Sequence, residues 1–139
     1  MRDEYIDTMR TTISKYSITE LHTASEVDDL FSRHKGTMLV FVNSACGCAA
    51  RVARPALAMA LEHTGTPGVV ATVFASSERE ATAQARKYFT DEPASSPSFA
   101  FLLDGKCLGM VHRSDIETST PENVARLLTD MFDKYFTNG

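Results

Sequence analysis

The feature that most constrains the fold is a strand pattern that runs into a helix pattern through two cysteines. Residues Met38–Val42 form a short, wholly apolar run, which is typical of a strand buried on both faces. From Ala49 to Leu61, small and apolar residues recur at helical spacing, and alanine is the best helix former. The tripeptide Cys46-Gly47-Cys48 stands between the two patterns. The sequence therefore predicts two thiols at a strand-to-helix junction.

This position favours a reactive cysteine. The first N–H groups of a helix have no partner inside the helix, and they favour negative charge nearby. A thiolate is negatively charged and is the form of cysteine that attacks disulfides. We therefore predict that Cys46 is the nucleophile and that Cys48 resolves a mixed disulfide formed on Cys46. Gly47 permits the backbone angles that so small a disulfide ring demands, and a strained ring is oxidising, which suits isomerisation or the removal of a thiol adduct.

Two other interpretations of the cysteine pair are weaker. Inert core cysteines are one, but paired thiols at such a junction are unusual in a core. A metal site is the other, but zinc usually takes four ligands at recognisable spacings. The chain has no second cysteine pair, and its four histidines are scattered, at His22, His34, His63 and His112. We therefore favour redox chemistry without a bound metal.

Residues near the pair have supporting roles. Ser44 is expected to cap the following helix or to donate a hydrogen bond to a thiolate. Arg51 and Arg54 are expected to be solvated, with a cationic rim for an acidic thiol substrate as the alternative. Cys107 falls in a strand pattern, where a small apolar filler is a more ordinary role than a third redox partner.

The rest of the chain alternates between helix and strand patterns. Helices are expected at 3–14, from a capping box at Thr23–Glu26 to near Gly36, from a second capping box at 77–80, and after the Thr120–Pro121 N-cap. Strands are expected at 18–21, 69–75, 99–103 and 107–112, with an Asp104–Gly105 hairpin between the last two. Pro55 lies inside the helix that follows the cysteines, where we expect it to bend the axis.

Alternating strands and helices form parallel sheets that are covered by helices on both faces. The closing hairpin must add an antiparallel edge. We therefore predict a single α/β domain, residues 1–139, with a central mixed sheet of five strands, flanking helices on both faces and an extra N-terminal helix. A buried strand that ends at two thiols makes this arrangement thioredoxin-like, while the element order alone leaves other strand orders open.

Composition excludes several classes of function. The formal net charge of -4 and the lack of a basic cluster argue against nucleic-acid binding. No apolar stretch approaches the roughly twenty residues of a membrane span, and the charged start is unlike a signal peptide. Three cysteines are too few, and odd in number, for a secreted disulfide framework. We expect a cytoplasmic protein, and a monomer, since no repeat or coiled-coil interface is visible.

Several segments together resemble the bacilliredoxin family, small thioredoxin-like proteins with a Cys-Gly-Cys active site. The strongest resemblance lies in Val42–Ala50 and Ala53–Ala56, and it extends nearly from end to end of the chain. Further matching segments are Thr72–Ala75, Glu80–Thr82, Tyr88–Thr90, Ser95–Ser98 and His112–Arg113. The resemblance implies a thiol–disulfide oxidoreductase that removes bacillithiol from S-bacillithiolated proteins.

The resemblance also implies roles for individual residues. Cys46 would attack the mixed disulfide and take the bacillithiol adduct, and Cys48 would release it and leave an intramolecular disulfide. Pro97 is the counterpart of the cis-proline opposite the active-site thiol, so the Ser96–Pro97 bond is expected to be cis, with the Ser96 backbone facing the substrate. The implied partners are S-bacillithiolated clients and bacillithiol, or another cellular reductant, with no tightly bound cofactor.

Alternatives to this function remain at this point. A protein disulfide isomerase or reductase would use the same cysteine pair, and a binding module would hold a metal on the two thiolates. General protein reduction is disfavoured, because the motif lacks the second spacer residue of ordinary thioredoxins and the chain contains no tryptophan.

Overall fold

The computed structural model describes residues 18–45, 47, 49–62, 67–90 and 92–136. Within them, one five-stranded sheet has the strand order β1-β3-β2-β4-β5. The strands are β1 (Thr19–Glu20), β2 (Thr37–Asn43), β3 (Val69–Phe74), β4 (Ser98–Leu103) and β5 (Lys106–Val111). The pairs β1–β3 and β3–β2 are parallel, whereas β2–β4 and β4–β5 are antiparallel. The mixed sheet predicted from the sequence is thus confirmed, with β2 at its centre.

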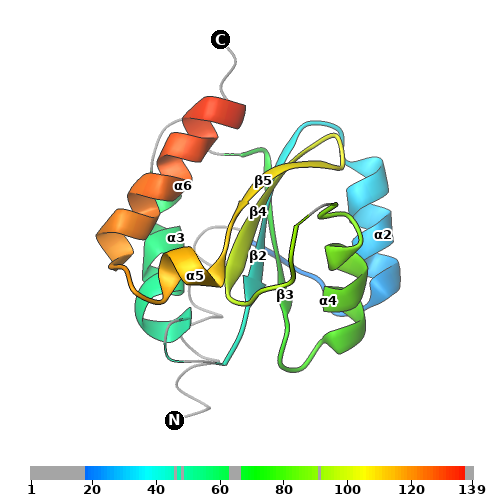
Figure 1. Ribbon diagram of the computed structural model, residues 1–139. Coiled ribbons are helices and arrows are strands. Elements are labelled where there is room, and N and C mark those ends of the chain that lie inside the picture. Colours follow the sequence, from blue (N-terminus) through cyan, green and yellow to red (C-terminus); the bar gives the residue numbers. More distant parts are fainter. Residues whose placement is uncertain (1–17, 46, 48, 63–66, 91, 137–139) are drawn as a thin grey trace.

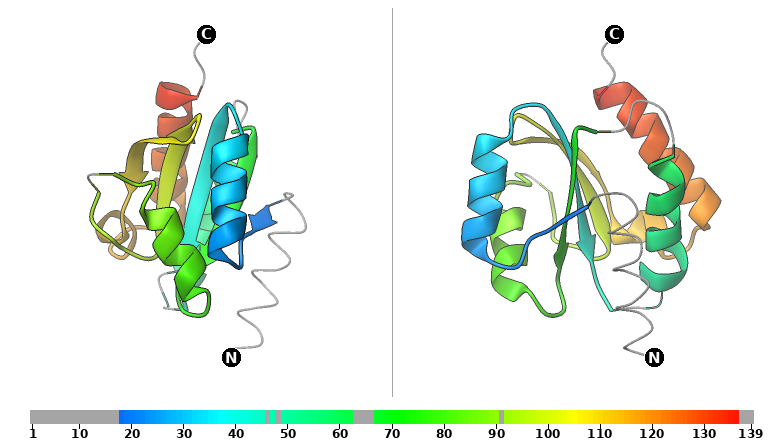
Figure 2. Two further views of the ribbon diagram at one scale, coloured as in Figure 1. Left: turned by 90° about the vertical axis from the view of Figure 1, so that its right-hand side faces the viewer. Right: turned by 180° about the vertical axis from the view of Figure 1, so that it is seen from behind.

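Helices cover both faces of the sheet, as predicted. They are α2 (Ala24–Arg33), the π-helix η1 (Ala49–Ala53) with α3 (Arg54–Ala60), α4 (Arg79–Arg86), α5 (Arg113–Ile116) and α6 (Pro121–Tyr135). Figure 1 shows α2 and α4 on one face and α3 and α6 on the other. The two further views in Figure 2 show the same three layers. None of the helices in the described part of the chain is long and apolar enough to cross a membrane.

Strand β2 is apolar from Met38 to Val42 because it supplies both halves of the core. Leu39 and Phe41 belong to the cluster packed under α3 and α6, together with Phe101 of β4. The alternate residues, Val40 and Val42 among them, belong to the cluster under α2 and α4. This division follows from the period of two along a strand, which sends neighbouring side chains to opposite faces.

Several segments with short sequence patterns form the local structures that those patterns predict. Glu26 N–H donates to Thr23 Oγ1 over 3.1 Å, and Thr23 N–H donates back to a Glu26 carboxylate oxygen, which completes the capping box. The Asp104–Gly105 turn has φ angles of 52° and 83°, the positive values that a tight two-residue hairpin requires. Thr120 caps α6 by accepting from Asn123 N–H over 3.1 Å.

Other expectations need correction. The capping box at 77–80 does not form, because Ser77 N–H and Glu78 N–H both donate to the Phe74 carbonyl and turn the chain there. Helix α4 instead begins at Arg79 without a side-chain cap. Helical spacing would place Leu127 on the same stripe of α6 as the buried Val124 and Leu128, but Leu127 is 39% exposed. The short helix α5 was not predicted, and the predicted helix at 3–14 lies outside the described residues.

Candidate active site

The central strand leads directly to the cysteine motif. Strand β2 ends at the fully buried Asn43, whose carbonyl accepts from Ala75 N–H over 2.9 Å. The Asn43 side chain accepts from the backbone N–H of the buried Ser44 over 2.8 Å, and Ala45 N–H donates to Ser76 Oγ over 3.2 Å. These bonds fix the chain up to the residue before Cys46. Cys46 and Cys48 themselves lie outside the described residues.

A helix begins at Ala49, immediately after the motif, as predicted. Its first five residues form the π-helix η1, and α3 continues from Arg54. The prediction of a single α-helix bent at Pro55 is therefore wrong in detail. Pro55 has no N–H to donate to the carbonyl of Arg51, so the regular α-helical pattern cannot run through this turn, and wider π-type hydrogen bonding precedes it. The junction of strand, motif and helix nonetheless stands where the sequence places it.

The segment Ser96–Pro97 lies beside the residues that lead into the motif. The Ser96–Pro97 peptide bond is cis, as the resemblance predicts, and Pro97 is buried. Val42 of β2 pairs with Ser98 of β4 in an antiparallel register. Asn43 follows Val42 and Pro97 precedes Ser98, so the two segments meet at the end of this ladder. The fold thus brings together two segments that are about fifty residues apart in the sequence.

A cationic side chain covers the middle of the motif. A β-carbon added to Gly47 would lie 3.0 Å from Nη2 of Arg51 and 3.3 Å from its Cζ. Gly47 is the sequence neighbour of both cysteines, so the guanidinium contacts the residue that joins them. Arg51 is exposed, as expected, but Arg54 is only 5% exposed and is not the solvated side chain that the sequence suggested. Arg54 begins α3 on the face that packs against the core.

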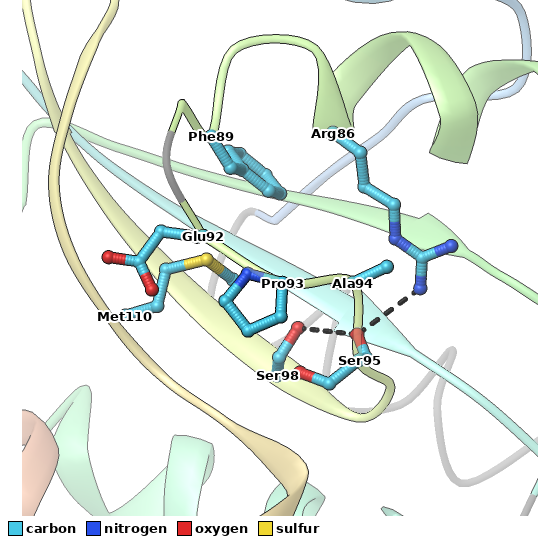
Figure 3. Close-up of a pocket in the computed structure, with 8 residues that line it drawn as sticks. All are labelled: Arg86, Phe89, Glu92, Pro93, Ala94, Ser95, Ser98 and Met110. Atoms are coloured by element: carbon cyan, nitrogen blue, oxygen red, sulfur yellow. Dashed lines mark hydrogen bonds between the residues drawn. The ribbon is translucent and has the colours of Figure 1, made fainter.

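A small pocket lies on the face covered by α4, and its lining includes the residues on either side of Ser96–Pro97 (Figure 3). Its volume is about 40 Å³, and its lining includes Arg86, Glu92, Ser95 and Ser98. Arg86 Nη2 donates to the Ser95 carbonyl over 3.2 Å, and Ser98 Oγ donates to the same carbonyl over 2.9 Å. Neither Arg86 nor Glu92 was singled out from the sequence, because no local pattern links them to the motif.

Cys107 lies at the far end of the sheet from the motif. It pairs with Leu102, which pairs with Met38 near the start of β2. Met38 and Asn43 are five positions apart along an extended strand, which corresponds to about 17 Å. Burial raises the pKa of the Cys107 thiol, and the negative charge of Glu92 raises it further. Its distance from the motif and its raised pKa both fit a small apolar packing residue, as expected from the sequence, rather than a third redox partner.

Metal binding has no support in the described side chains. Among them, no three histidine, cysteine, aspartate or glutamate residues gather into a group that could hold an ion. Cys46 and Cys48 are not among these described residues. What the described geometry offers instead is a loop at the end of a buried strand, a helix start, a cation over Gly47 and the adjacent cis-proline segment at Ser96–Pro97.

Comparison with solved structures shows the same fold elsewhere. An oxidised thioredoxin from Plasmodium falciparum superposes with a TM-score of 0.61 at 19% identity, covering 86% of this chain and 99% of that one. A mutant thioredoxin from Halobacterium salinarum gives a TM-score of 0.60 at 18% identity, covering 87% of this chain and 92% of that one. The fold is therefore thioredoxin-like, as the sequence predicts.

Comparison with known sequences is more specific. A family model described as disulphide isomerase matches residues 1–136. A bacilliredoxin from Geobacillus kaustophilus is 52% identical over 116 residues, which cover 84% of this chain and 79% of the relative. A bacilliredoxin from Koribacter versatilis is 46% identical over 127 residues, which cover 91% of this chain and 88% of the relative. The chain therefore belongs to the bacilliredoxin family and is a thiol–disulfide oxidoreductase.

Proposed function

We propose that this oxidoreductase removes bacillithiol from S-bacillithiolated proteins, with Cys46 as the nucleophile and Cys48 as the resolving cysteine. The observation that carries the proposal is the placement of Gly47. It follows the buried end of β2, precedes a helix, and stands under the guanidinium of Arg51. The identity of about half to known bacilliredoxins supports a redox role for the cysteines on either side of Gly47.

The proposed chemistry takes two exchange steps. In the first, the Cys46 thiolate attacks the bacillithiol sulfur of the mixed disulfide, so that a Cys46–bacillithiol disulfide forms and the client cysteine leaves as a thiolate. In the second, the Cys48 thiolate attacks Cys46 and releases bacillithiol as a thiolate. The client and bacillithiol gain the two electrons that the protein's cysteine pair loses as it becomes a disulfide.

The chain's other proposed site residues serve these steps. Ser96 presents its backbone to the substrate beside the motif, and the buried Pro97 holds that stretch against the end of β2. Gly47 allows the tight turn between the cysteines, and Ser44 anchors the chain just before Cys46. Arg51 and the start of the helix favour the thiolate over the thiol.

The proposal defines the partners of the protein. The substrates are S-bacillithiolated clients, bacillithiol is the thiol co-substrate, and a second bacillithiol or another cellular thiol reductant returns the disulfide to the dithiol. No tightly bound cofactor takes part. This chemistry suits a reducing cytoplasm, and the protein would act there as a single-domain monomer.

Mass analysis of a bacillithiol-modified client tests the proposal. The reduced wild-type protein should return the client to its unmodified mass, and Cys46→Ala should leave it modified. Cys107→Ser is the matched control, a cysteine substitution remote from the motif, and should act like the wild type. A Cys46→Ala variant that still strips the client would contradict the assignment.

A second candidate function is protein disulfide isomerisation, and the description of the matching family model favours it. The same two cysteines would serve, with Cys46 attacking a non-native protein disulfide and the client's own thiol releasing it. Recovery of activity from a scrambled disulfide protein, without any small thiol, distinguishes this function. An active wild type in that assay, together with a client that stays bacillithiolated, would favour isomerisation.

A further inference from the structure

A chain of hydrogen bonds runs from a carboxylate, through a histidine, to a serine next to the active-site segment. His112 Nε2 lies 2.7 Å from a Glu92 carboxylate oxygen, and His112 Nδ1 lies 2.7 Å from Ser95 Oγ. The His112 and Glu92 side chains are only 19% and 29% exposed, so water competes little for these bonds. His112 comes directly after β5, whereas Glu92 and Ser95 come from the loop before β4.

The hydrogen bonds also determine the roles of the two ring nitrogens. A carboxylate can only accept, so Glu92 requires an N–H on Nε2. In the neutral ring Nδ1 is then an acceptor for the Ser95 hydroxyl, and in the charged ring it donates to the same oxygen. The link between His112 and Ser95 therefore exists in both protonation states. Its strength depends on Glu92, which holds the ring in place.

Ser95 is held at its carbonyl as well as at its hydroxyl. Arg86 and Ser98 both donate to the Ser95 carbonyl, as the dashed lines in Figure 3 show. Arg113 Nη1 donates to the Ser96 carbonyl over a longer 3.4 Å. The residues just before Pro97 are thus held by side chains from α4, β4 and α5 and by His112, which follows β5.

We infer that His112 is the positioning residue for the Ser95–Pro97 segment, and that it sets how fast Cys46 attacks a disulfide substrate. The segment directly precedes Ser98, which pairs with Val42 at the end of β2 that leads into Cys46. A displacement of Ser95 would therefore move the surface on which the substrate is proposed to rest. A misplacement of about 1 Å can cost an enzyme up to about a hundredfold in rate. The inference rests on the proposed role of Cys46 as nucleophile.

Two reactions of Cys46 distinguish a loss of substrate positioning from a general loss of the protein's structure. Oxidised glutathione carries peptide groups that can rest on the Ser96 backbone, and its attack by Cys46 gives a protein–glutathione disulfide and one glutathione thiolate. Iodoacetamide alkylates the same thiol without needing that surface. In a Cys48→Ala background both products are stable, and intact mass with peptide mapping gives both rates.

The expected result is a split between the two rates. His112→Ala and Ser95→Ala should slow the reaction with oxidised glutathione about tenfold, with alkylation by iodoacetamide changed less than about twofold. His112→Asn should restore most of the lost rate, because its side-chain oxygen takes the place of Nδ1 and accepts from Ser95. Ser95→Ala removes one hydroxyl and provides the test if His112→Ala does not fold.

The matched control is His34→Ala. His34 is also half-buried and bonds through Nε2 to the Thr37 carbonyl over 3.1 Å, but it caps the end of α2, before β2 and at the other end of that strand from the motif. It should leave both rates unchanged. Equal rates in wild type and His112→Ala, or a parallel loss of both rates, would overturn the role of His112. A wild-type Cys46 that reacts with neither reagent would overturn its role as nucleophile, and the inference with it.

Discussion

The guanidinium of Arg51 lies over Gly47, so close that a β-carbon on the glycine would be 3.0 Å from Nη2. The two residues are one helical turn apart, and the π-helix that begins at Ala49 carries Arg51 on its exposed side. A positive charge is thereby held beside the residue that joins the two cysteines. Nearby cations and helix starts are the two common means by which proteins stabilise a thiolate.

Replacing Arg51 should make Cys46 less reactive. A unit charge at about 6 Å in water contributes about 0.7 kcal/mol, which is about a threefold effect. Arg51→Gln should therefore raise the pKa of the Cys46 thiol and slow its alkylation at neutral pH about threefold. Arg51→Lys retains the charge and is the control. An effect that is equal for both variants, or that high salt does not reduce, would argue against a charge interaction.

Replacing Cys107 should leave the reaction unchanged. Its thiol lies at the other end of the sheet, and burial raises its pKa, so little thiolate is present at neutral pH. Cys107→Ser should retain full activity, and peptide mapping after brief alkylation should find Cys46 labelled well before Cys107. A loss of more than about twofold in turnover would show that Cys107 takes part in the chemistry.

The contact between α2 and α4 should make stability depend on pH. One Asp28 carboxylate oxygen accepts from Tyr88 Oη over 2.7 Å and from Gln84 Nε2 over 2.8 Å. The hydrogen bond from Tyr88, followed by that from Gln84, lowers the pKa of Asp28 in the folded protein. A lowered carboxyl pKa contributes stability above the unfolded pKa, and this is lost as the pH falls through the folded pKa.

Thermal unfolding of Asp28→Asn measures this contribution. The variant should have a lower Tm than the wild type at about pH 7, and the difference should shrink towards about pH 3. Tyr88→Phe removes the hydroxyl but keeps the ring, whose centroid lies 4.7 Å from that of Phe31. Its difference in Tm from the wild type should therefore also shrink as the pH falls. A difference in Tm that stays constant with pH would contradict the role of the carboxylate.

The β4–β5 hairpin should not tolerate a side chain at Gly105. Its φ is 83°, and a β-carbon there would lie 3.0 Å from the backbone oxygen of Phe31. Gly105→Ala should lower the free energy of unfolding by about 1–2 kcal/mol in a urea titration. Gly68→Ala is the control, because its β-carbon would approach no atom closer than 3.5 Å. Similar losses in both variants would show that the turn geometry is not responsible.

The sequence predicts the parts of this fold that local patterns encode. The apolar run at 38–42, the capping box at Thr23–Glu26 and the Asp104–Gly105 turn each depend on residues within a few positions of one another. Burial on both faces of β2 follows from its unbroken apolar run. The position of the Cys-Gly-Cys motif in the fold also follows from local patterns, because the motif separates the strand pattern from the helix pattern.

The sequence does not predict the features that long-range contacts decide. His112 and Glu92 are twenty residues apart and meet only because β5 returns beside the loop before β4. The burial of Arg54 depends on how α3 packs against the sheet, since the same residue type at Arg51 is exposed. To predict the π-helix, one would need to know how the chain adjusts to the missing N–H of Pro55. The helical spacing of the alanines carries no such information.

The central claim is that Cys46 takes bacillithiol from a modified protein before Cys48 releases it. Intact-mass spectrometry of Cys48→Ala, after incubation with an S-bacillithiolated client, tests it most directly. The account predicts a mass increase of one bacillithiol, which is lost on reduction and absent when Cys46 is also replaced by alanine. An unmodified Cys48→Ala protein beside a client that remains bacillithiolated would contradict it.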